Sequence, residues 1–212
     1  MPRDTNTPLS QTSHAGRIDD LERRLQEKSA EAEALKRIGQ AIGLMLDMPR
    51  MLQMVAEIVQ QVTATDVCLI YFLNESKTEL VLRAASSTAH GVVGKVRMKV
   101  GEGLTGWVAE TRERVALDRD AFRDSRFKLV PELKQDGFNS LLSVPLIGRE
   151  DLIGVINVRT DKAHEYTDAK IELLESIAGQ VAEAIENSAQ FQLMQRRASQ
   201  LTTLAEIIRT IY

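Results

Sequence analysis

The first regular hydrophobic pattern along the chain is a helical one, with mostly apolar residues in alternating steps of three and four. Its positions are Ile18, Leu21, Leu25, Lys28, Ala32, Leu35, Gly39, Ile42 and Leu46. This is the a/d spacing of a coiled coil. Residues 17–47 therefore predict a coiled-coil or signalling helix, with a dimer seam at Ile18, Leu21, Leu25 and Leu35. The alternative is an amphipathic helix that packs on its own domain.

The segments at the two ends of the chain differ from each other in composition. Residues 1–16 are rich in Thr, Ser, Pro and Asn, which is typical of a disordered tail. Residues 191–212 predict a C-terminal signalling helix. The apolar spacing of Thr202–Ile211 repeats that of Glu33–Ile42. This echo suggests that the chain is a fragment and that a downstream module begins beyond Tyr212.

The middle of the chain mixes two periodicities and predicts an α+β domain. A helix is expected at Met51–Thr65, and a longer one is expected from Asp168 with Thr167 as its N-cap. Alternating or apolar runs predict strands at Val67–Leu73, Leu80–Ala84, Val93–Val100, Val115–Leu117, Ser140–Ile147 and Leu152–Arg159. The mixed-charge segment between residues 121 and 137 is expected to be irregular, with a short helix near Leu129–Lys134.

One glycine motif, Gly101-Glu102-Gly103-Leu104-Thr105-Gly106, has the G-x-G-x-x-G form of a dinucleotide-binding loop. That loop requires a parallel βαβ unit with a crossover helix, yet only about eight residues separate Gly106 from the next strand. The strand before the motif alternates in polarity, whereas a parallel strand is apolar on both faces. We therefore expect the glycines to shape a sharp strand-to-helix turn, against which Trp107 folds its ring onto the sheet.

Three stretches resemble the successive signatures of a GAF domain. They are "VGEGLTGWVAETRERVAL", "SLLSVPLIGREDLIGVINV" and "EYTDAKIELLESIAGQVAEAIENS". The resemblance covers roughly residues 48–190. It implies a five- or six-stranded antiparallel sheet of the GAF/PAS-like kind, with helices from both ends on one face and a small ligand pocket on the other. Long N- and C-terminal helices flank this domain.

The resemblance also carries an expectation about function, because GAF domains are mostly sensors and dimerising modules of signalling proteins. The spacing of Val92–Gly103 is similar to that of GAF modules attached to bacterial histidine kinases, antiterminator regulators and the nitrogen-branch phosphotransferase enzyme I. The expected partners are a second copy of the chain, an unidentified small molecule and an output module in cis or in trans. No cofactor is expected.

Composition and charge argue against several partners and sites but do not change the predicted fold class. The net charge is −3, which gives no basis for binding nucleic acid or an anionic membrane. No apolar run approaches the ~20 residues of a membrane span, and the N-terminus has no secretory apolar segment. A single cysteine, Cys68, fits a reducing cytoplasm. One cysteine and three histidines are too few for a Cys/His zinc site.

The same residues argue against several GAF subtypes and against an enzyme. Cys68 lies within an apolar strand, where it is expected to be a buried small hydrophobe and neither a bilin attachment site nor a redox thiol. His90 is the one histidine near a possible pocket rim, and it is interpreted as a loop residue. No nucleophile stands in a recognisable catalytic motif, so no catalytic residue is assigned.

The candidate ligand pocket is assembled from one irregular segment and two strands. In "LDRDAFRDSRFK", Phe122 and Phe127 are too apolar for a purely solvated loop, so they are expected to cover a cavity. The full set of pocket candidates is Trp107, Asp118, Arg119, Phe122, Phe127, Ser140, Ser143 and Asn157. For Asn157 two readings stay open: local backbone pairing or a position in the pocket.

These observations predict a non-enzymatic sensory GAF domain that is dimerised by its flanking helices. A ligand would order residues 118–133 and shift the packing of the helices on the other face of the sheet. The alternative is a dimerisation spacer whose pocket is filled by side chains. A small redox or hydrolytic enzyme is the third and weakest reading.

Overall fold

The computed structural model of the chain describes residues 11–44, 47–86, 91–133 and 138–188. The helices are α1 (Gln11–Leu44), α2 (Met48–Thr63) and α3 (Gly103–Thr111), together with helical residues 168–188 and the 3-10 turns η2 (Ala121–Arg123) and η3 (Pro131–Leu133). The strands are β1 (Val67–Leu73), β2 (Glu79–Ala85), β3 (Arg97–Lys99), β4 (Val115–Leu117), β5 (Ser140–Ile147) and β6 (Leu152–Thr160).

The strands form one six-stranded sheet in the order β3-β2-β1-β6-β5-β4, and every neighbouring pair is antiparallel. Because the pairs are antiparallel, short turns connect β1 to β2 and β5 to β6. The β1–β6 pairing joins the first strand to the last and closes the domain. This arrangement confirms the predicted α+β class and excludes a parallel dinucleotide-binding sheet.

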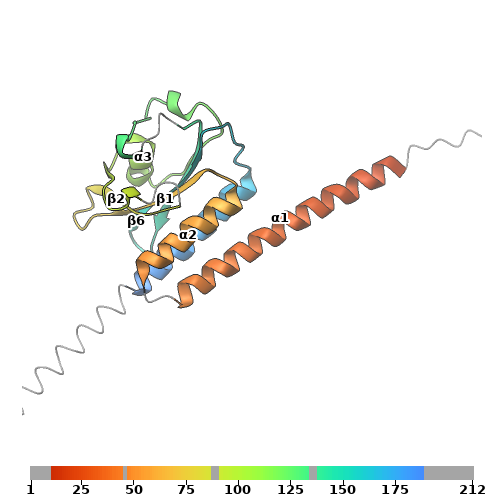
Figure 1. Cartoon of the computed structure of the whole chain (residues 1–212), viewed down its shortest axis with the longest axis horizontal. Helices are drawn as coiled ribbons and strands as arrows, with labels where there is room; N and C mark the ends of the chain where they lie inside the picture. Colours follow the sequence, from red (N-terminus) through yellow and green to blue (C-terminus); the bar gives the residue numbers. More distant parts are fainter. Residues whose placement is uncertain (1–10, 45–46, 87–90, 134–137, 189–212) are drawn as a thin grey trace, which may run out of the picture.

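Side-chain alternation along the strands divides the core into two layers. Cys68, Ile70, Ile156 and Val158 point to one side, where α2, residues 168–188 and the end of α1 cover the sheet. We call this side the helical face. Figure 1 shows α2 and the last helix lying side by side along it. The predicted placement of helices from both ends of the domain on one face is confirmed.

The opposite side, which we call the pocket face, is covered by α3 and by the irregular segment that contains η2 and η3 (Figure 1). Leu69, Tyr71, Leu141 and Val155 contribute its buried side chains. Short elements cover this face and long helices cover the other. A cavity is therefore easier to form here, because irregular segments fill a surface less regularly than a helix stripe does.

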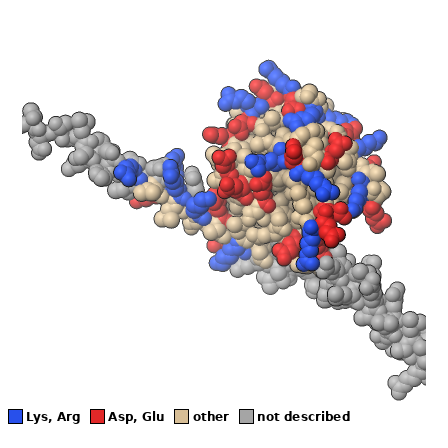
Figure 2. Space-filling view, turned by 180° about the vertical axis from the view of Figure 1, so that it is seen from behind, with Lys and Arg blue, Asp and Glu red and all other residues tan. Residues whose placement is uncertain are grey.

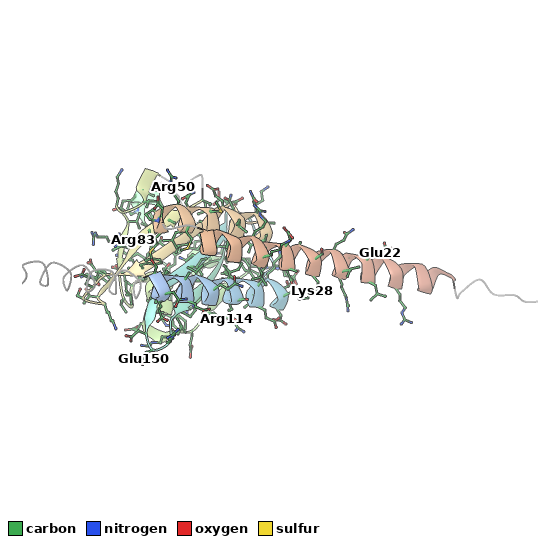
Figure 3. The ribbon with its side chains drawn as sticks, turned by 90° about the horizontal axis from the view of Figure 1, so that it is seen from below. Glu22, Lys28, Arg50, Arg83, Arg114 and Glu150 are labelled. Atoms are coloured by element: carbon green, nitrogen blue, oxygen red, sulfur yellow. The ribbon has the colours of Figure 1, made fainter. Side chains whose placement is uncertain are left out.

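Helix α1 divides into two parts with different surroundings. Ala34 and Ile38 are buried in the core of the helical face and Leu35 is half-buried against it, so the packed-helix alternative holds for this part. Leu21 and Leu25 are 63% and 71% exposed. Figure 3 shows the part that carries the labelled Glu22 extending beyond the domain. The Ile18 side chain lies outside the described residues.

Several element boundaries differ from the sequence-based expectation for local reasons. Helix α1 begins at Gln11, before the expected start at residue 17, within the predicted tail. Helix α2 includes Pro49 in its first turn, where the missing N–H has no partner to lose. Strand β3 is shorter than expected because Gly94, at φ +78°, lies in a turn. Residues 1–10 and 191–212, with their predicted tail and signalling helix, lie outside the described residues.

The face of the molecule seen in Figure 2 shows no large region of one charge sign among the described residues. In Figure 2, lysine and arginine side chains alternate with aspartate and glutamate over the visible face. Within the part of the chain that the structure describes, no helix combines the length and the apolar character needed to cross a bilayer.

Candidate functional site

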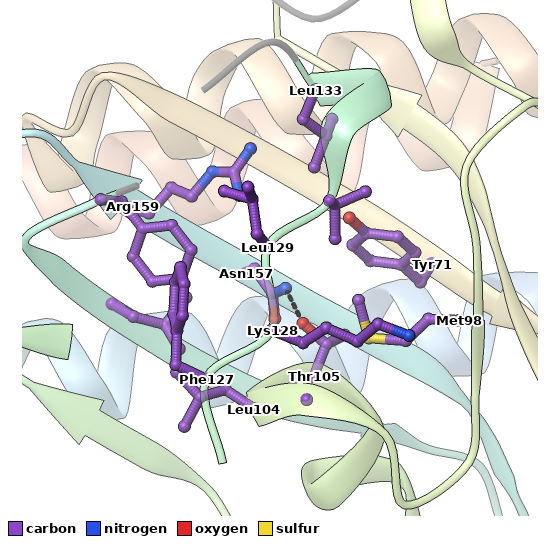
Figure 4. A pocket seen from close by; sticks show the side chains of 14 residues that line it. Tyr71, Met98, Leu104, Thr105, Phe127, Lys128, Leu129, Leu133, Asn157 and Arg159 are labelled. Atoms are coloured by element: carbon purple, nitrogen blue, oxygen red, sulfur yellow. Dashed lines mark hydrogen bonds between the residues drawn. The ribbon is translucent and has the colours of Figure 1, made fainter. Parts of the chain in front are cut away.

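A cavity lies between the pocket face of the sheet and residues 127–133, which we call the lid. Its volume is about 30 Å³, room for roughly one or two water molecules. Most of its walls are apolar (Figure 4). The lining residues are Tyr71, Met98, Gly103, Leu104, Thr105, Phe127, Lys128, Leu129, Val130, Leu133, Phe138, Leu141, Asn157 and Arg159.

The glycine motif forms one wall of this cavity through its backbone shape. Gly101 and Gly103 have φ values of +82° and +67°, which L residues with a side chain rarely adopt. Gly106 permits a close approach instead, because a Cβ there would lie 2.4 Å from the carbonyl oxygen of Lys99. The turn brings Leu104 and Thr105 against the sheet. The steric interpretation of the motif therefore agrees with the geometry.

Asn157 of β6 belongs to a buried hydrogen-bond network on the pocket face. Its Nδ2 donates to Thr105 Oγ1 at 2.7 Å, and its Oδ1 accepts from Ser143 Oγ at 2.5 Å. Ser143 is its direct neighbour across the β5–β6 pair. The amide therefore ties α3 to two central strands, and the two open readings resolve into a side-chain network at the cavity wall.

Arg159 lies two residues beyond Asn157 on β6 and therefore on the same face. Arg159 is 6% exposed, and its guanidinium carbon lies 5.1 Å from the Phe138 ring centroid. Nε and Nη2 are buried and have no hydrogen-bond partner in the part of the chain that the structure describes. Burial lowers the pKa of Arg159, while Tyr71 and Asp161 act in the opposite direction.

Tyr71 of β1 carries the other polar group in the depth of the cavity. Burial raises the pKa of its phenol to about 12, although the charge of Arg159 opposes this shift. Tyr71 and Arg159 come from neighbouring strands, and Leu129 lies between them in the view of Figure 4. A neutral phenol and a cationic guanidinium thus face a cavity whose other described walls are mainly aliphatic.

Two contacts hold the lid, one to the glycine turn and one to Phe138, which precedes β5. Lys128 Nζ donates to Glu102 Oε1, and Glu102 Oε2 in turn accepts from the Lys99 backbone N–H. The rings of Phe127 and Phe138 pack edge to face, with centroids 5.3 Å apart. The ion pair lies at a partly exposed surface, while Leu133 of the lid is buried in the pocket-face core, so opening the lid should cost more than breaking the ion pair and less than unfolding the domain.

Trp107 does not line the cavity, but its ring contacts the segment that leads to the lid. The Arg126 guanidinium lies over its ring at 4.5 Å from the centroid. Asp124 holds that guanidinium with two hydrogen bonds, at 2.9 and 2.8 Å. The indole is half-buried against the core of the pocket face. Its emission should therefore respond when the neighbouring lid moves.

The structure brings together only part of the predicted pocket set. Phe127 and Asn157 line the cavity, and Ser143 reaches it through Asn157. Phe122 is 46% exposed, with Arg123 over its ring, so it lies away from the cavity. The remaining candidates, Asp118, Arg119 and Ser140, are also absent from the lining.

Asp118 and Ser140 instead have contacts near the start of the last helix. Asp118 Oδ1 accepts from the Tyr166 N–H at 2.9 Å, and its carbonyl accepts from the His164 N–H at the same distance. Ser140 Oγ lies 3.4 Å from the Tyr166 hydroxyl. Arg119 is exposed. Asp118 and Ser140 therefore connect the end of β4 and the start of β5 to the segment that precedes residue 168.

Arg159 and Tyr71 are the residues that the sequence-based reasoning missed. A signal for Arg159 was present, because Asn157 and Arg159 stand two apart in a strand and must share a face. A charge at the end of an apolar strand is ordinarily interpreted as solvent-facing. Tyr71 gave no signal, since it is one of several large residues in a continuous apolar run.

Metal and thiol chemistry find no site in the described residues. No group of three or more His, Cys, Asp or Glu side chains is positioned there to hold a metal ion. Cys68 is fully buried on the helical face, away from the cavity, and burial raises the pKa of its thiol. The thiolate that redox chemistry requires is therefore disfavoured.

Comparison with known proteins assigns the domain. Residues 45–186 match the model of a family described as "GAF domain". The crystallised GAF domain of an Acinetobacter phosphoenolpyruvate-protein phosphotransferase is 26% identical and has a TM-score of 0.68. The match covers 75% of this chain and 94% of that one.

Two relatives are much longer than this chain. A protein of the Escherichia coli phosphoenolpyruvate-dependent phosphotransferase system is 26% identical over 124 residues, which are 58% of this chain and 16% of that protein. The Nif-specific regulatory protein of Herbaspirillum seropedicae is 25% identical over 168 residues, 76% of this chain and 31% of that protein. The family model, the six-stranded antiparallel sheet and the similarity to a crystallised GAF domain agree. The chain therefore belongs to the GAF domain family.

Proposed function

We propose that this GAF domain is a sensor that binds a small molecule under the lid and passes the binding event to its helices. The observation that best supports this proposal is the lid-covered cavity on the face of the sheet opposite the helices. The similarity to a regulatory protein supports the broad regulatory role. Ligand binding, relay and dimerisation are the parts that belong to the proposal.

The relay follows from the alternation of side chains in the central strands. On β6, Asn157 and Arg159 contact the cavity, whereas Ile156 and Val158 pack in the core with α2 and residues 168–188. A ligand that displaces these cavity side chains shifts the backbone that also carries the helical-face residues. Because protein interiors are close-packed, such shifts are transmitted and not absorbed.

The output surface of the proposal is the exposed part of α1. Leu21 and Leu25 project from the domain and present an apolar stripe that a second copy of the chain would cover. The C-terminal part of the same helix packs in the helical-face core through Ala34 and Ile38. Because α1 carries both the packed residues and the proposed dimer seam, a change in helical-face packing would move the seam. An output module in cis or in trans would respond to that movement.

The spacer alternative has one specific observation in its favour. The cavity of about 30 Å³ is too small for a metabolite, because lid side chains occupy the space. A ligand must displace Leu129 or Leu133 to enter. The sensor proposal therefore requires the lid to open when a ligand binds, whereas the spacer alternative requires the lid to stay closed. An enzyme is disfavoured by the inaccessible Cys68 thiol and by the absence of a nucleophile–base pair at the described cavity walls.

A metabolite screen followed by Trp107 emission separates the two. Trp107 is the only tryptophan of the chain, so its emission reports one place. A ligand that displaces the lid should shift this emission in the wild type. The response should be weakened in Phe127→Ala, which removes a side chain from the cavity wall.

Phe122→Ala is the matched control, because Phe122 lies in the same segment but outside the cavity. It should leave the response unchanged. A screen in which no molecule shifts the emission, with Phe127→Ala merely less stable, would leave the spacer in place.

The dimer is tested independently with substitutions in the exposed part of α1. Light scattering should show a dimer for the wild type and a monomer for the double variant Leu21→Ser, Leu25→Ser. The domain itself should keep its stability within about 0.5 kcal/mol, since both side chains are exposed in the single chain. Glu22→Gln on the same helix is the control and should remain dimeric. A monomeric wild type would contradict the seam.

A further inference from the structure

Arg159 poses a question that the sensor proposal leaves open, namely what balances its charge. Buried polar groups are ordinarily hydrogen-bonded, and buried charges are paired. Here Nε and Nη2 are both buried and without a partner in the described part of the chain. The other cation at the cavity, Lys128, already has Glu102. None of the described lining residues is an aspartate or a glutamate.

The two unpartnered nitrogens have a defined geometric relation. In a guanidinium, the Nε–H bond and one Nη2–H bond point in nearly parallel directions along one edge of the plane. That edge matches the two oxygens of a carboxylate, which accept a pair of parallel hydrogen bonds. The Phe138 ring lies against the guanidinium of Arg159 and restricts its orientation. The structure thus holds a carboxylate-shaped edge ready at a buried position on the cavity wall.

The surroundings of this edge indicate what the rest of the ligand resembles. The aliphatic walls come from Met98, Leu104, Leu129 and Leu133. The side-chain amide of Asn157 is already engaged, because its Nδ2 donates to Thr105 and its Oδ1 accepts from Ser143. Apart from the Tyr71 phenol and Lys128, which Glu102 already pairs, a second anionic group on the ligand would meet mainly apolar walls. A tetrahedral dianion such as phosphate would place two charges against one unpaired guanidinium, with few other donors in reach.

We propose that the cavity binds a small aliphatic carboxylic acid, with its carboxylate paired to the Nε–Nη2 edge of Arg159 and its chain under the lid. The proposal rests on the sensor function and names the chemical class of its ligand. It explains why a buried arginine without a hydrogen-bond partner at Nε and Nη2 lines a mainly apolar cavity. The lid excludes water from the ion pair, which strengthens it.

The test uses the full chain and a matched series of probes, followed by thermal unfolding and by Trp107 emission. The probes are acetate, propionate and butyrate, each compared with its neutral amide, and inorganic phosphate. The three carboxylates should raise the unfolding midpoint of the wild type in a concentration-dependent way. The amides and phosphate should not, because neither offers one planar monoanion to the guanidinium edge.

Two variants of Arg159 make the result specific. Arg159→Met should lose the response to carboxylates, yet without any probe it should unfold at the same temperature or higher, because an unpaired buried charge has been removed. A purely structural role would instead lower the midpoint. Arg159→Lys keeps the charge but lacks the paired edge, so it should bind about tenfold more weakly or worse. Arg83→Met, at an exposed position on β2, is the control and should respond as the wild type does.

The outcomes also separate this inference from the sensor function. Carboxylates that act equally on Arg159→Met, or amides that act as well as acids, would overturn the inference. A neutral molecule that shifts wild-type Trp107 emission and fails on Phe127→Ala would overturn it as well, while leaving the sensor standing. Silence from every probe and from the wider metabolite screen would overturn both.

Discussion

The two faces of the sheet use the same strands for different purposes. On the helical face, Ile70, Ile156 and Leu174 are fully buried in an apolar core that long helices cover. On the pocket face, the same strands carry Tyr71, Asn157 and Arg159 under a short irregular lid. The first arrangement gives stability and the second leaves a cavity and an unpaired charge. The difference teaches that one strand can serve packing and binding at alternate positions.

The largest expected effect comes from neighbouring leucines on β5 that point to opposite faces. Leu142 is fully buried in the helical-face core, and Leu141 lines the cavity. Leu142→Ala should lower the free energy of unfolding by ~3–5 kcal/mol, because the helix packing cannot collapse around the gap. Leu141→Ala should cost less, ~2–3 kcal/mol, since the lid can settle into the space. Urea unfolding measures both. Equal losses would mean that the two faces are packed alike.

The next effect concerns the glycine turn that supports the cavity. Gly106→Ala should cost ~1–3 kcal/mol, because the new Cβ would lie 2.4 Å from the Lys99 carbonyl oxygen and the backbone must shift. Gly179→Ala is the matched control in the helix at residues 168–188. Its Cβ meets nothing within 4 Å, so the higher helix propensity of alanine should stabilise the protein by ~0.5–1 kcal/mol.

Thermal unfolding of these two glycine variants gives the comparison directly. A destabilised Gly179→Ala would show that the last helix is under constraints the single chain does not reveal. A neutral Gly106→Ala would contradict the close approach on which the turn depends.

A smaller effect should appear in the pH dependence of the lid. The Lys128 hydrogen bond, and then that of the Lys99 N–H, lower the pKa of Glu102 below its usual value of 4.5. The folded state therefore holds the ionised form more strongly than the unfolded chain does. The resulting stability is fully present above pH 4.5 and is lost as the pH falls through the lowered value.

Glu102→Gln removes this one contribution and isolates it. The wild type should be the more stable protein at neutral pH, and the difference between the two should shrink as the pH falls below the usual range of a glutamate. Asp66 and Asp124, whose pKa values are also lowered, are present in both proteins and cancel in the comparison. A difference that does not change with pH would show that the Lys128–Glu102 pair does not stabilise the fold.

The contrast between the faces also explains what the sequence could predict. Strand positions followed from periodicity, and β1, β4 and β5 lie at the predicted residues because apolar runs bounded by polar turns leave little choice. In α1, the seam spacing continues through residues in two different environments, so periodicity alone could not separate the exposed part from the packed part. What decides that difference is contact with the rest of the fold.

The pocket face was harder to predict because irregular segments have no period. Phe122 and Phe127 look equivalent in sequence, yet one is exposed and the other lines the cavity. Phe122 lies within the η2 turn, and Phe127 follows it. Arg159 was missed because a charge in a strand is ordinarily solvent-facing, and only the folded structure shows it buried beside the lid.

The most direct test of the central claim is mass spectrometry of the small molecules that remain bound to the purified full chain. The wild type and Arg83→Met should release the same organic acid, and Arg159→Met should release none of it. A wild-type protein that releases no small molecule, or three proteins that release the same molecules, would contradict the claim that the pocket face binds a carboxylate ligand through Arg159.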